Sequence, residues 1–423
     1  MISYMQRIYK LCVYSCIMKC RICNHSDLKE FLSLGKSPLA NSFLSKENLE
    51  KEEPEYPLEL TFCTDCKLVQ LTYVVSPELM FRNYLYVSST SDTFKIHFTN
   101  MAEKISKDFN LNEKSLAVDI GSNDGLLLNG FKKCGLKTIG VEPATNLAKL
   151  AEQNGVETIN DFFNGSTVKN IIENKGHADV VTANNVFAHV DNILEFTKNV
   201  GSLLKRDGIF VVEVQYLVDM INKMTFDNIY HEHLSYFTLT SLSTFFKRHD
   251  MEVFDAQRVD SHGGSLRVFI KKSEGKFDVN PAVNQILMHE KKIGVEDFKL
   301  YQKFADKVYG VKQKLTDKIG AIKIEGKKIA GYGAPAKSTT LLNFCRIGKD
   351  HLDYIIDENK LKQGLFSPGT HIQIVGPKIL DIKKPDYILI LAWNFAEEIL
   401  KKTKKYADSN VKFIIPLPEP LII

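Results

Sequence analysis

Two pairs of cysteines near the N-terminus have the spacing of a metal site: Cys20 and Cys23 in CRIC, and Cys63 and Cys66 in CTDC. Each C-x-x-C pair offers two thiolates at the angle that tetrahedral Zn²⁺ requires, so the four predict a closed site in which the metal stabilises the fold and does no chemistry. The gap between the pairs is long for a zinc ribbon, and a hairpin or loop around residues 38–57 would fill it. Two disulfide bonds are the alternative, and a thioredoxin-like redox site would need only one pair.

A glycine-rich turn follows the first clear strand, in VDIGSNDGLLL, which carries Asp119, Gly121, Asn123 and Gly125. Glycines let the backbone approach a nucleotide-like ligand, and the following helix presents free amides at its N-terminus. The turn lacks the full G-x-G-x-x-G of a dinucleotide fold and is a weak signal alone. Glu142 ends the next strand, in GVEP, where its carboxylate would reach the two hydroxyls of a ribose.

NAD and S-adenosylmethionine both carry such a ribose, and the acids around the turn favour one of them. Asp119 and Asp124 would repel a pyrophosphate and attract a cationic cofactor. We therefore expect S-adenosylmethionine. A domain that keeps this fold without the ligand is the alternative.

A dense group of titratable side chains lies in NIYHEHLSYF, with Tyr230, His231, Glu232 and His233 in consecutive positions. Imidazole titrates near neutrality, and a neighbouring carboxylate can orient it and tune its basicity. A structural histidine is the commoner explanation for one histidine alone. A catalytic metal is disfavoured because H-E-H lacks the i, i+4 histidine pair of a zinc protease. The cluster therefore predicts acid–base chemistry.

The hydrophobic pattern predicts the elements that position these groups. From about residue 115, short β-branched runs such as SLAVDI and LKTIGVEP alternate with helical segments such as TNLAKLAEQNG. This alternation predicts a doubly wound α/β domain, with a parallel sheet and helices on both faces. MEVFDAQRVD and SLRVFIKK, joined by SHGG, predict an antiparallel edge pair. Residues 284–324 predict one long helix or two, and a smaller strand–turn–helix unit follows.

The composition bounds the class of protein. The 423 residues, with 44% hydrophobic and 25% charged, are typical of a globular chain of about two to three domains. A net charge of +4, with basic residues interleaved among acidic ones, disfavours a dedicated nucleic-acid binder. No apolar run approaches the roughly 18 residues that span a bilayer. The first twenty residues lack the small-residue cleavage site of a secretory signal, so we expect a cytoplasmic protein that contacts neither nucleic acid nor membrane.

The central motifs resemble those of class I S-adenosylmethionine-dependent methyltransferases, with VDIGSNDG as the cofactor loop and GVEP as the ribose-binding strand end. The resemblance implies that Asp161 and Phe162, in NDFF, flank the adenine. It also implies that Asn184, in TANN, lies near the methionine portion of the cofactor.

Taken in order, CRIC, CTDC, FRNYLYVSSTS, VDIGSNDG, NNVFAHV, YHEHLSYF, HGGSLR and GYGAPAKSTTLLN resemble the nucleotide-sugar C-methyltransferase family from about Lys19 to the C-terminus. The family methylates nucleotide-linked 4-keto deoxysugars at a ring carbon beside the ketone, usually carbon 3. The resemblance implies a zinc-binding domain at 19–80, a methyltransferase domain at 81–283, and a helical bridge with a Rossmann-like domain that helps hold the sugar nucleotide at 284–423. We interpret residues 1–18 as an upstream extension, because the first cysteine motif follows Met18 directly.

By position, the resemblance also implies roles for single residues. His233 is the expected catalytic base, with Glu232 and Tyr230 beside it. His189 in NVFAHV is expected at the same pocket, and Tyr84 in FRNYLY is expected to reach in from the zinc-binding domain. Tyr84, Tyr230 and His189 all remain candidates for the donor that stabilises the enolate oxygen.

Two further motifs are candidates for binding the substrate. GYGAPAKSTT places Gly333 and Lys337 on a turn that opens a helix, a seat for part of a sugar diphosphate, although Lys337 as a solvated helix residue is equally compatible. In HGGSLR the glycines would form the edge turn, while His262 and Arg267 would face the substrate, with Arg267 as a phosphate partner.

Three other functions remain open at this point. A sugar O-methyltransferase could use the same base to deprotonate a hydroxyl. An RNA methyltransferase would need a concentrated basic surface, which the mixed run KENLEKEEPE does not offer. A non-enzymatic scaffold would not bind S-adenosylmethionine. The sequence leaves the oligomeric state open, with a monomer as the simplest expectation.

Overall fold

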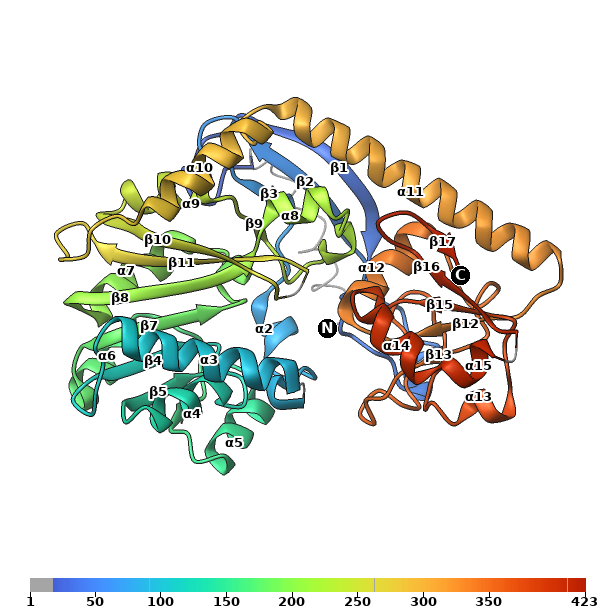
Figure 1. The fold of residues 1–423 in the computed structure, drawn as a ribbon, viewed down its shortest axis with the longest axis horizontal. Coiled ribbons are helices and arrows are strands. Elements are labelled where there is room, and N and C mark those ends of the chain that lie inside the picture. Colours follow the sequence, from blue (N-terminus) through green and yellow to red (C-terminus); the bar gives the residue numbers. More distant parts are fainter. Residues whose placement is uncertain (1–17, 91, 262, 409) are drawn as a thin grey trace, which may run out of the picture.

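The computed structural model describes residues 18–90, 92–261, 263–408 and 410–423, and three β-sheets organise them (Figure 1). The expected extension, apart from Met18, and the candidate residue His262 lie outside this described part of the chain.

The N-terminal sheet has four strands in the order β1-β2-β3-β9, and all neighbours pair antiparallel. The strands are β1 (Leu28–Ser37), β2 (Tyr56–Cys63), β3 (Val69–Leu71) and β9 (Ser235–Tyr236). β9 comes from the middle of the chain and pairs with β3, with Val69 opposite Tyr236 and Gln70 opposite Ser235. The N-terminal sheet is thus completed by the segment that directly follows His233.

The chain between β1 and β2 runs as a loop with one short 3-10 helix, as the long spacing between the cysteine pairs predicts. After β3, three helical elements lead into the central domain. They are α2 (Pro77–Phe81), η2 (Ser88–Thr90) and α3 (Asp92–Asp108). The 3-10 helix in the loop between β1 and β2 is η1 (Lys46–Asn48).

The central sheet has seven strands in the order β10-β11-β8-β7-β4-β5-β6. Five are parallel: β4 (Leu116–Ile120), β5 (Lys137–Val141), β6 (Thr158–Ile159), β7 (Ala178–Asn184) and β8 (Leu204–Gln215). The predicted edge pair is β10 (Met251–Val259) and β11 (Ser265–Lys272), and β11 lies antiparallel between β8 and β10. Helices and 3-10 turns connect them: α4 (Leu126–Lys133), α5 (Thr145–Gln153), α6 (Gly165–Lys175), η3 (Phe187–His189), α7 (Ile193–Leu203), α8 (Leu217–Asn222), η4 (Phe226–Asn228) and α9 (Leu239–Lys247).

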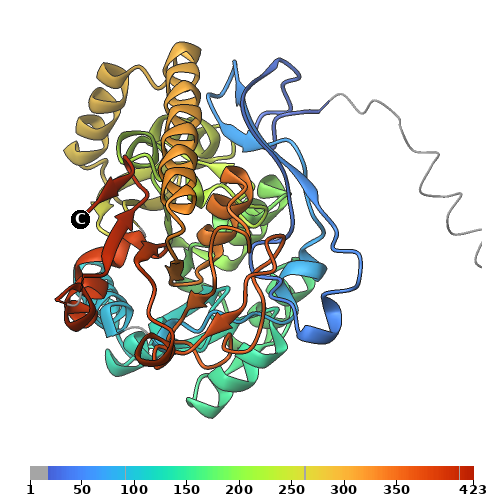
Figure 2. The ribbon, with the colours of Figure 1, turned by 90° about the vertical axis from the view of Figure 1, so that its right-hand side faces the viewer.

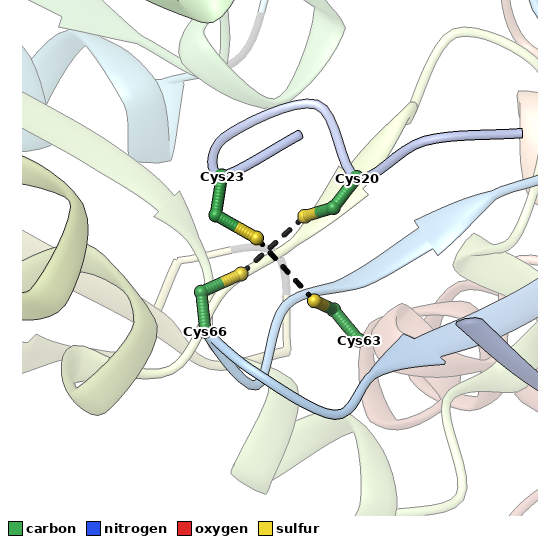
Figure 3. A group of neighbouring side chains, drawn as sticks. All are labelled: Cys20, Cys23, Cys63 and Cys66. Carbon is green, nitrogen blue, oxygen red and sulfur yellow. Dashed lines mark hydrogen bonds between the residues drawn. The ribbon is translucent and has the colours of Figure 1, made fainter. Parts of the chain in front are cut away.

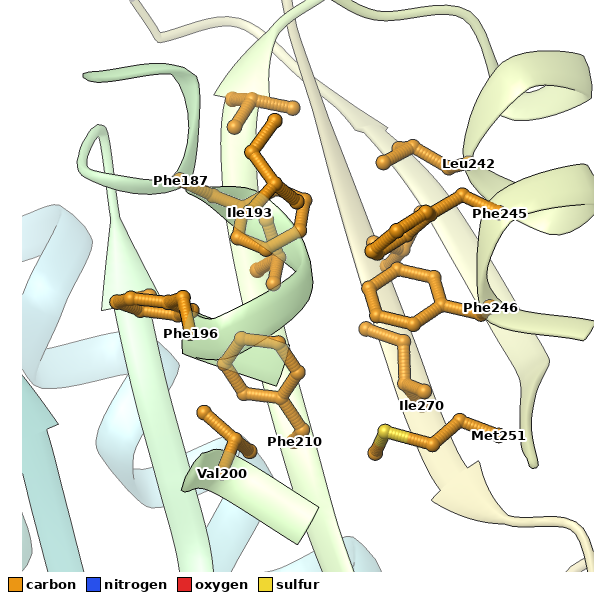
Figure 4. Close-up of a cluster of buried hydrophobic side chains, with 14 of the residues drawn as sticks. Phe187, Ile193, Phe196, Val200, Phe210, Leu242, Phe245, Phe246, Met251 and Ile270 are labelled. Atoms are coloured by element: carbon orange, nitrogen blue, oxygen red, sulfur yellow. The ribbon is translucent and has the colours of Figure 1, made fainter. Parts of the chain in front are cut away.

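The central strands of this sheet are largely buried because helices cover both of its faces. Every residue of β4 is buried. On one face, phenylalanines of α9 pack against the sheet, with the ring of Phe246 5.7 Å from that of Phe187 and 6.2 Å from that of Phe210 (Figure 4). This core holds the ends of β7 and β8, where the site lies.

The C-terminal domain is a smaller doubly wound unit. Its sheet has the order β14-β13-β12-β15-β16-β17, parallel except for the last pair. The strands are β12 (Ile329–Tyr332), β13 (Ile355–Ile356), β14 (Ile374–Val375), β15 (Tyr387–Ile390), β16 (Lys412–Ile415) and β17 (Leu421–Ile422). Its helices are α12 (Ala336–Cys345), α13 (Ile379–Ile382), η5 (Trp393–Phe395), α14 (Ala396–Lys402) and α15 (Lys404–Ala407). The predicted fold class is confirmed.

The bridge to this domain is two helices, α10 (Pro281–Ile293) and α11 (Phe298–Ile324). α11 runs along the top of Figure 1 from the N-terminal sheet to the C-terminal domain, and Figure 2 shows the N-terminal strands beside it. One hydrophobic core joins Leu60 and Phe62 of β2, Tyr301 and Val308 of α11, and Leu341 of α12. The N-terminal and C-terminal parts therefore pack as one body around α11.

Among the described residues, none of the helices has the length and apolar character required to cross a bilayer.

Candidate active site

The turn after β4 has the backbone that only glycine adopts without strain. Gly121 has a φ of +65°, and a Cβ there would lie 2.4 Å from a methyl carbon of Val186 in the loop after β7. The Gly121 amide donates a hydrogen bond of 2.7 Å to the carbonyl of Val141 at the end of β5. Gly125, with a φ of +79°, is the N-cap of α4. The glycines therefore let three strand ends meet closely.

Glu142 ties the end of β5 to this turn. Its Oε2 accepts a hydrogen bond of 2.8 Å from the Asn123 amide, and its Oε1 accepts one of 2.8 Å from the Ala144 amide. Burial raises the pKa of the Glu142 carboxyl. A carboxylate has about four acceptor positions, so these two bonds leave capacity for the ribose hydroxyls. That contact stays a prediction.

Asp119 is a buried acid near the end of β4, with 5% of its surface exposed. Its Oδ1 accepts a hydrogen bond of 2.5 Å from the Thr182 hydroxyl. Burial raises the pKa of Asp119 to about 7, and the nearby charge of Glu142 adds to the shift. A cation beside Asp119 would reverse this shift, so the site favours a positively charged ligand.

Asn184, at the end of β7, is the third expected contact. Its amide oxygen and nitrogen are both buried and have no hydrogen bond of ordinary length to another described residue. The Asn184 side chain lies close enough to Asp119 to lower the pKa of that carboxyl in part, and it keeps hydrogen-bonding capacity for a polar ligand. The acids, this amide and the close-packed glycines fit S-adenosylmethionine, which carries ribose hydroxyls and a cationic centre.

The expected adenine-binding pair lies under an arginine from the connecting segment, residues 82–90. The guanidinium of Arg82 lies 4.6 Å from the centre of the Phe162 ring and 3.8 Å from Oδ1 of Asp161. Further along the segment, the Tyr84 amide donates to Oδ1 of Asn146 at 3.1 Å, and the Asn146 amide donates back to the Tyr84 carbonyl at 2.7 Å. The connecting segment therefore lies across the cofactor loops.

Tyr84 and Glu232 meet in a small pocket between the N-terminal and central parts. The Tyr84 hydroxyl donates to Oε2 of Glu232 at 2.6 Å, and the Asn41 amide donates to Oε1 at 2.7 Å. Burial raises the pKa of Glu232, and these two hydrogen bonds lower it in part. Asn41, in the loop after β1, was missed by the sequence analysis. An amide inside the apolar stretch LANSFL was the available signal.

The four residues of YHEH form a turn, in which the His233 amide donates to the Tyr230 carbonyl at 2.9 Å. The turn brings its first and last rings together, so that Tyr230 and His233 have centroids 4.1 Å apart. Nδ1 of His233 lies 2.7 Å from the carbonyl oxygen of Asn228. In this structure the Asn228 carbonyl lies at Nδ1 of His233, while the Glu232 carboxylate accepts its hydrogen bonds from Tyr84 and Asn41.

His231 points the other way. Its Nε2 lies 3.2 Å from the carbonyl oxygens of both Tyr56 and Pro57, which belong to β2. Burial lowers the pKa of His231, and the two backbone carbonyls oppose that shift. The ring thus links the turn to the N-terminal sheet.

His189, in η3, lies beside His233. Its ring centre is 5.1 Å from that of His233 and is stacked on Phe81 of α2 at 5.6 Å. The structure therefore gathers His233, Tyr230, His189, Tyr84 and Glu232, which come from the N-terminal and central parts of the chain.

The C-terminal domain closes the same region. The Thr340 hydroxyl of α12 donates to the Ile229 carbonyl, just before the YHEH turn, at 2.9 Å. The neighbouring Thr339 hydroxyl donates to the Ala40 carbonyl, next to Asn41, at 2.9 Å. The turn is thus held by all three parts of the molecule.

The expected substrate residues lie in different settings. Lys337, at the start of α12, lies over the Trp393 ring at 5.2 Å, and the charge of Asp227 opposes the lowering of the Lys337 pKa by burial. A Cβ on Gly333 would lie 2.5 Å from Ala392, so this glycine is required for packing between two strand ends.

Arg267 forms an ion pair inside the central domain. Its guanidinium is buried and donates twice to Oε2 of Glu213, at 2.9 and 2.7 Å. His97 lies 3.0 Å from the other oxygen of that carboxylate. Arg267 therefore has a buried carboxylate as its partner in this structure, and its role toward a phosphate stays a prediction.

The four cysteines of the predicted metal site meet as free thiols. Their Sγ atoms all lie within 4.8 Å of one another, and Figure 3 shows them converging from the loop before β1 and the end of β2 with the turn after it. Cys20 and Cys66 are 3.3 Å apart, and Cys23 and Cys63 are 3.5 Å apart. Tetrahedral Zn²⁺ with Zn–S near 2.3 Å separates its sulfurs by about 3.8 Å, so the four thiols fit one ion.

Three family models match successive parts of the chain. They are described as "Putative zinc binding domain", at residues 20–81, "Methyltransferase domain", at 96–256, and "C-methyltransferase C-terminal domain", at 260–418.

Relatives of known sequence or structure match to different extents. C-methyltransferase NovU of Streptomyces niveus is 37% identical over 407 residues, which cover 96% of this chain and 97% of NovU. A ubiquinone biosynthesis O-methyltransferase of Rhodopseudomonas palustris is 32% identical over 114 residues, covering 25% of this chain and 45% of that enzyme. The structure of the plantazolicin methyltransferase BpumL with SAH has 16% identity and a TM-score of 0.34, and the alignment covers 44% of this chain and 88% of BpumL.

The match to NovU runs from the cysteine motifs to the C-terminal domain, so it includes every part of the site described above. The central fold and its cofactor loops belong to an S-adenosylmethionine-dependent methyltransferase, and the four cysteines belong to a zinc-binding domain. The chain is therefore a member of the C-methyltransferase family to which NovU belongs, with S-adenosylmethionine as its methyl donor.

Proposed function

We propose that this C-methyltransferase acts on a nucleotide-linked 4-keto deoxysugar and methylates the ring carbon beside the ketone, carbon 3. The observation that carries the proposal is the pairing of the Tyr230 and His233 rings, 4.1 Å apart, with His189 beside them. Carbon becomes nucleophilic where an adjacent carbonyl acidifies its proton. The reaction then needs a base and a hydrogen-bond donor at one pocket, which these side chains supply.

His233 is the proposed base. A carbonyl oxygen only accepts hydrogen bonds, so Nδ1 of His233, 2.7 Å from the Asn228 carbonyl, carries the hydrogen. The lone pair of the neutral ring is then on Nε2. We assign the removal of the proton next to the ketone to Nε2, and the Asn228 carbonyl stabilises the imidazolium that results. When bound, S-adenosylmethionine supplies the methyl group.

Tyr230 is the proposed donor to the enolate oxygen. The proton of the Tyr84 hydroxyl is directed to Glu232, so Tyr84 presents acceptor lone pairs to the pocket. This favours Tyr84 and Glu232 as groups that orient the sugar hydroxyls, and leaves Tyr230 and His189 nearest to the base. A well-placed donor to an oxyanion contributes roughly 2.7 to 4 kcal/mol.

The position of the pocket supports an extended substrate. The YHEH turn contacts the N-terminal sheet through His231 and the C-terminal domain through the carbonyl of Ile229. A sugar at His233 could therefore place its diphosphate toward α12, where Lys337 is the proposed cationic partner. The same carbon chemistry without a nucleotide would not need this third domain.

Proton exchange tests the base separately from methyl transfer. The enzyme is incubated in D₂O with a 4-keto sugar nucleotide and with S-adenosylhomocysteine in place of the methyl donor. We expect deuterium to enter the carbon beside the ketone with the wild-type enzyme and not with His233→Asn. Exchange at the wild-type rate in the variant would remove His233 from this role.

Product analysis tests the substrate class. A panel of nucleotide-linked 4-keto sugars is incubated with S-adenosylmethionine labelled with ¹³C in its methyl group, and the products are read by mass spectrometry and NMR. We expect a labelled methyl group bonded to carbon 3. A methyl bonded to oxygen, or transfer to no member of the panel, would reject the proposed substrate.

A further inference from the structure

We propose that Arg21 is a positioning residue, which links the zinc site to the two chain segments that carry His189 and His233. The inference rests on the proposed function, because it takes these two histidines as members of the reaction pocket. Nothing in the four-cysteine site itself requires an arginine between its first two ligands.

Arg21 lies between Cys20 and Cys23 and directs its side chain away from the metal site. Its Nη1 donates to the carbonyls of Leu71, at 2.9 Å, and Leu234, at 3.1 Å. Its Nε donates to Oδ1 of Asp191 at 3.2 Å. One guanidinium therefore contacts three separate segments of the chain.

Two of these segments are the histidine segments. Leu234 directly follows His233, and Asp191 lies two residues after His189. The segments also contact each other, because the Leu234 amide donates to the Ala188 carbonyl at 2.9 Å. Arg21 thus lies where the spacing between the two histidines is set.

The backbone of Arg21 is fixed as well. Its amide donates to Oε1 of Gln70 in β3 at 2.9 Å. With two ligand cysteines as neighbours and Gln70 on the amide, the start of the side chain has little freedom. Closing the metal site therefore determines where the guanidinium can reach.

The chemistry of the contacts requires arginine. The Arg21 side chain is only 8% exposed, whereas that of Asp191 is 59% exposed. The planar guanidinium can serve two carbonyls and a carboxylate from fixed directions, while a lysine ammonium is a single point charge on a flexible stem. Lysine at this position would keep the charge but only part of the contacts.

Backbone pairing alone would hold the N-terminal sheet against the pocket. The Leu71 amide donates to the Leu234 carbonyl at 2.9 Å as part of the β3–β9 contact. That contact does not reach Asp191, and it is joined to the His189 segment indirectly, through the bond from the Leu234 amide to the Ala188 carbonyl. The guanidinium adds a direct tie from the N-terminal part to the His189 segment, through Asp191.

The test compares Arg21→Ala and Arg21→Lys with a matched control, Arg248→Ala. Arg248 also binds a residue inside a C-x-x-C pair, since its Nη1 donates to Oδ2 of Asp65 at 2.8 Å, but on the exposed surface. Zinc content is measured on the full-length proteins, and the imidazole signals of His189 and His233 are followed by NMR with ¹³C-labelled histidine. The signals are assigned from His189→Gln and His233→Asn. Turnover is measured in parallel.

We expect Arg21→Ala to retain zinc, to move both imidazole signals, and to lower kcat by ~10- to 100-fold with KM changed only a few-fold, because small displacements of reacting groups are costly. Arg21→Lys should give an intermediate shift of the signals. Arg248→Ala should resemble the wild type in all three measurements.

The outcomes separate this inference from the proposed function. Unchanged imidazole signals in Arg21→Ala would overturn the positioning role. If Arg21→Ala loses zinc, Arg21→Lys decides, and a lysine variant with zinc and with wild-type signals would also overturn it. Shifted signals with normal turnover would support the positioning role and would reject the catalytic role of the two histidines.

Discussion

The hydroxyl of Tyr84 donates a hydrogen bond of 2.6 Å to Oε2 of Glu232, 148 residues further along the chain. The other carboxylate oxygen accepts from Asn41, so both partners of Glu232 lie outside the methyltransferase sheet. The acid next to His233 is therefore satisfied by the N-terminal part of the chain. The loop after β1 contributes to this contact through Asn41, and the connecting segment contributes through Tyr84.

Tyr84→Phe tests that relationship. The variant leaves one oxygen of a buried carboxyl without its donor, which costs roughly 1 to 3 kcal/mol. We expect kcat/KM for the sugar nucleotide to fall by ~10- to 100-fold, with the affinity for S-adenosylmethionine changed only a few-fold. Steady-state kinetics and calorimetry measure the two quantities. Tyr73→Phe is the control, because Tyr73 is 41% exposed and its ring stacks on Tyr56. A normal kcat/KM for Tyr84→Phe would contradict the prediction.

His233→Asn and His231→Gln form a matched pair within one turn. His233 is proposed as the base, whereas His231 lies against the carbonyls of Tyr56 and Pro57. We expect His233→Asn to lower turnover by ~100-fold or more, with little change in cofactor affinity or melting temperature. His231→Gln should lower the melting temperature and leave turnover within a few-fold. If His231→Gln lowered turnover and His233→Asn lowered only the melting temperature, His231 and not His233 would be the histidine that faces the pocket.

Asp119→Asn gives a prediction with a defined pH dependence. Burial raises the folded-state pKa of Asp119 from 3.8 to about 7. A raised pKa means that the folded state binds the proton more tightly, so stability is lost as pH rises from about 4 to 7 and is constant above. The penalty at pH 8 is of the order of 4 kcal/mol, and Asn, which stays neutral, avoids it.

We therefore expect Asp119→Asn without cofactor to melt at a higher temperature than the wild type at pH 8, and at a similar temperature at pH 4 to 5. Its affinity for S-adenosylmethionine should fall by ~10-fold or more at pH 8, where the wild-type carboxylate is ionised. Thermal scans and calorimetry at both pH values check this. If the variant and the wild type had equal melting temperatures at pH 8, the predicted stability effect would be refuted. If they bound S-adenosylmethionine equally at pH 8, the predicted role of Asp119 in cofactor binding would be refuted.

The strands and helices that support the site were predictable because their signals are local. SLAVDI and LKTIGVEP are short β-branched runs with turns after them, and they form β4 and β5 with the acids near their carboxyl ends. The four cysteines were equally clear, since the geometry of zinc fixes their spacing. Glu142 and Asp119 lie near the cofactor turn for the same reason.

The contacts between the domains were not predictable from local signals. β9 has two residues, which is too short for an alternating pattern, and its partner β3 is far away in the sequence. The direction of Glu232 depends on the turn at residues 230–233, which separates it from His233 and aims it at Tyr84. The pairing of Arg267 with Glu213 depends on the register between β11 and β8, which no local pattern indicates.

Lys337 allows substrate binding and stability to be separated. It lies near Asp227, which is fully buried, accepts a hydrogen bond of 2.6 Å from Nε1 of Trp393, and has its Oδ1 buried without a hydrogen bond to a described residue. Burial raises the pKa of Asp227, and the charge of Lys337 opposes that shift. Lys337→Met therefore removes the counter-charge of a buried acid and also the proposed cationic partner of the diphosphate.

We expect Lys337→Met to raise KM for the sugar nucleotide by ~10-fold and to lower the free energy of unfolding by roughly 1 to 3 kcal/mol at pH 8. The loss of stability should shrink toward pH 4, because Asp227 then takes up a proton and needs no counter-charge. Adding Asp227→Asn should restore the stability and leave KM high, since the amide is neutral but the phosphate still lacks its partner. Denaturant unfolding and steady-state kinetics on both variants measure these changes.

Two outcomes would contradict this prediction. An unchanged KM in Lys337→Met would remove Lys337 from the substrate site. If adding Asp227→Asn failed to restore the stability, Asp227 would not be the partner of Lys337.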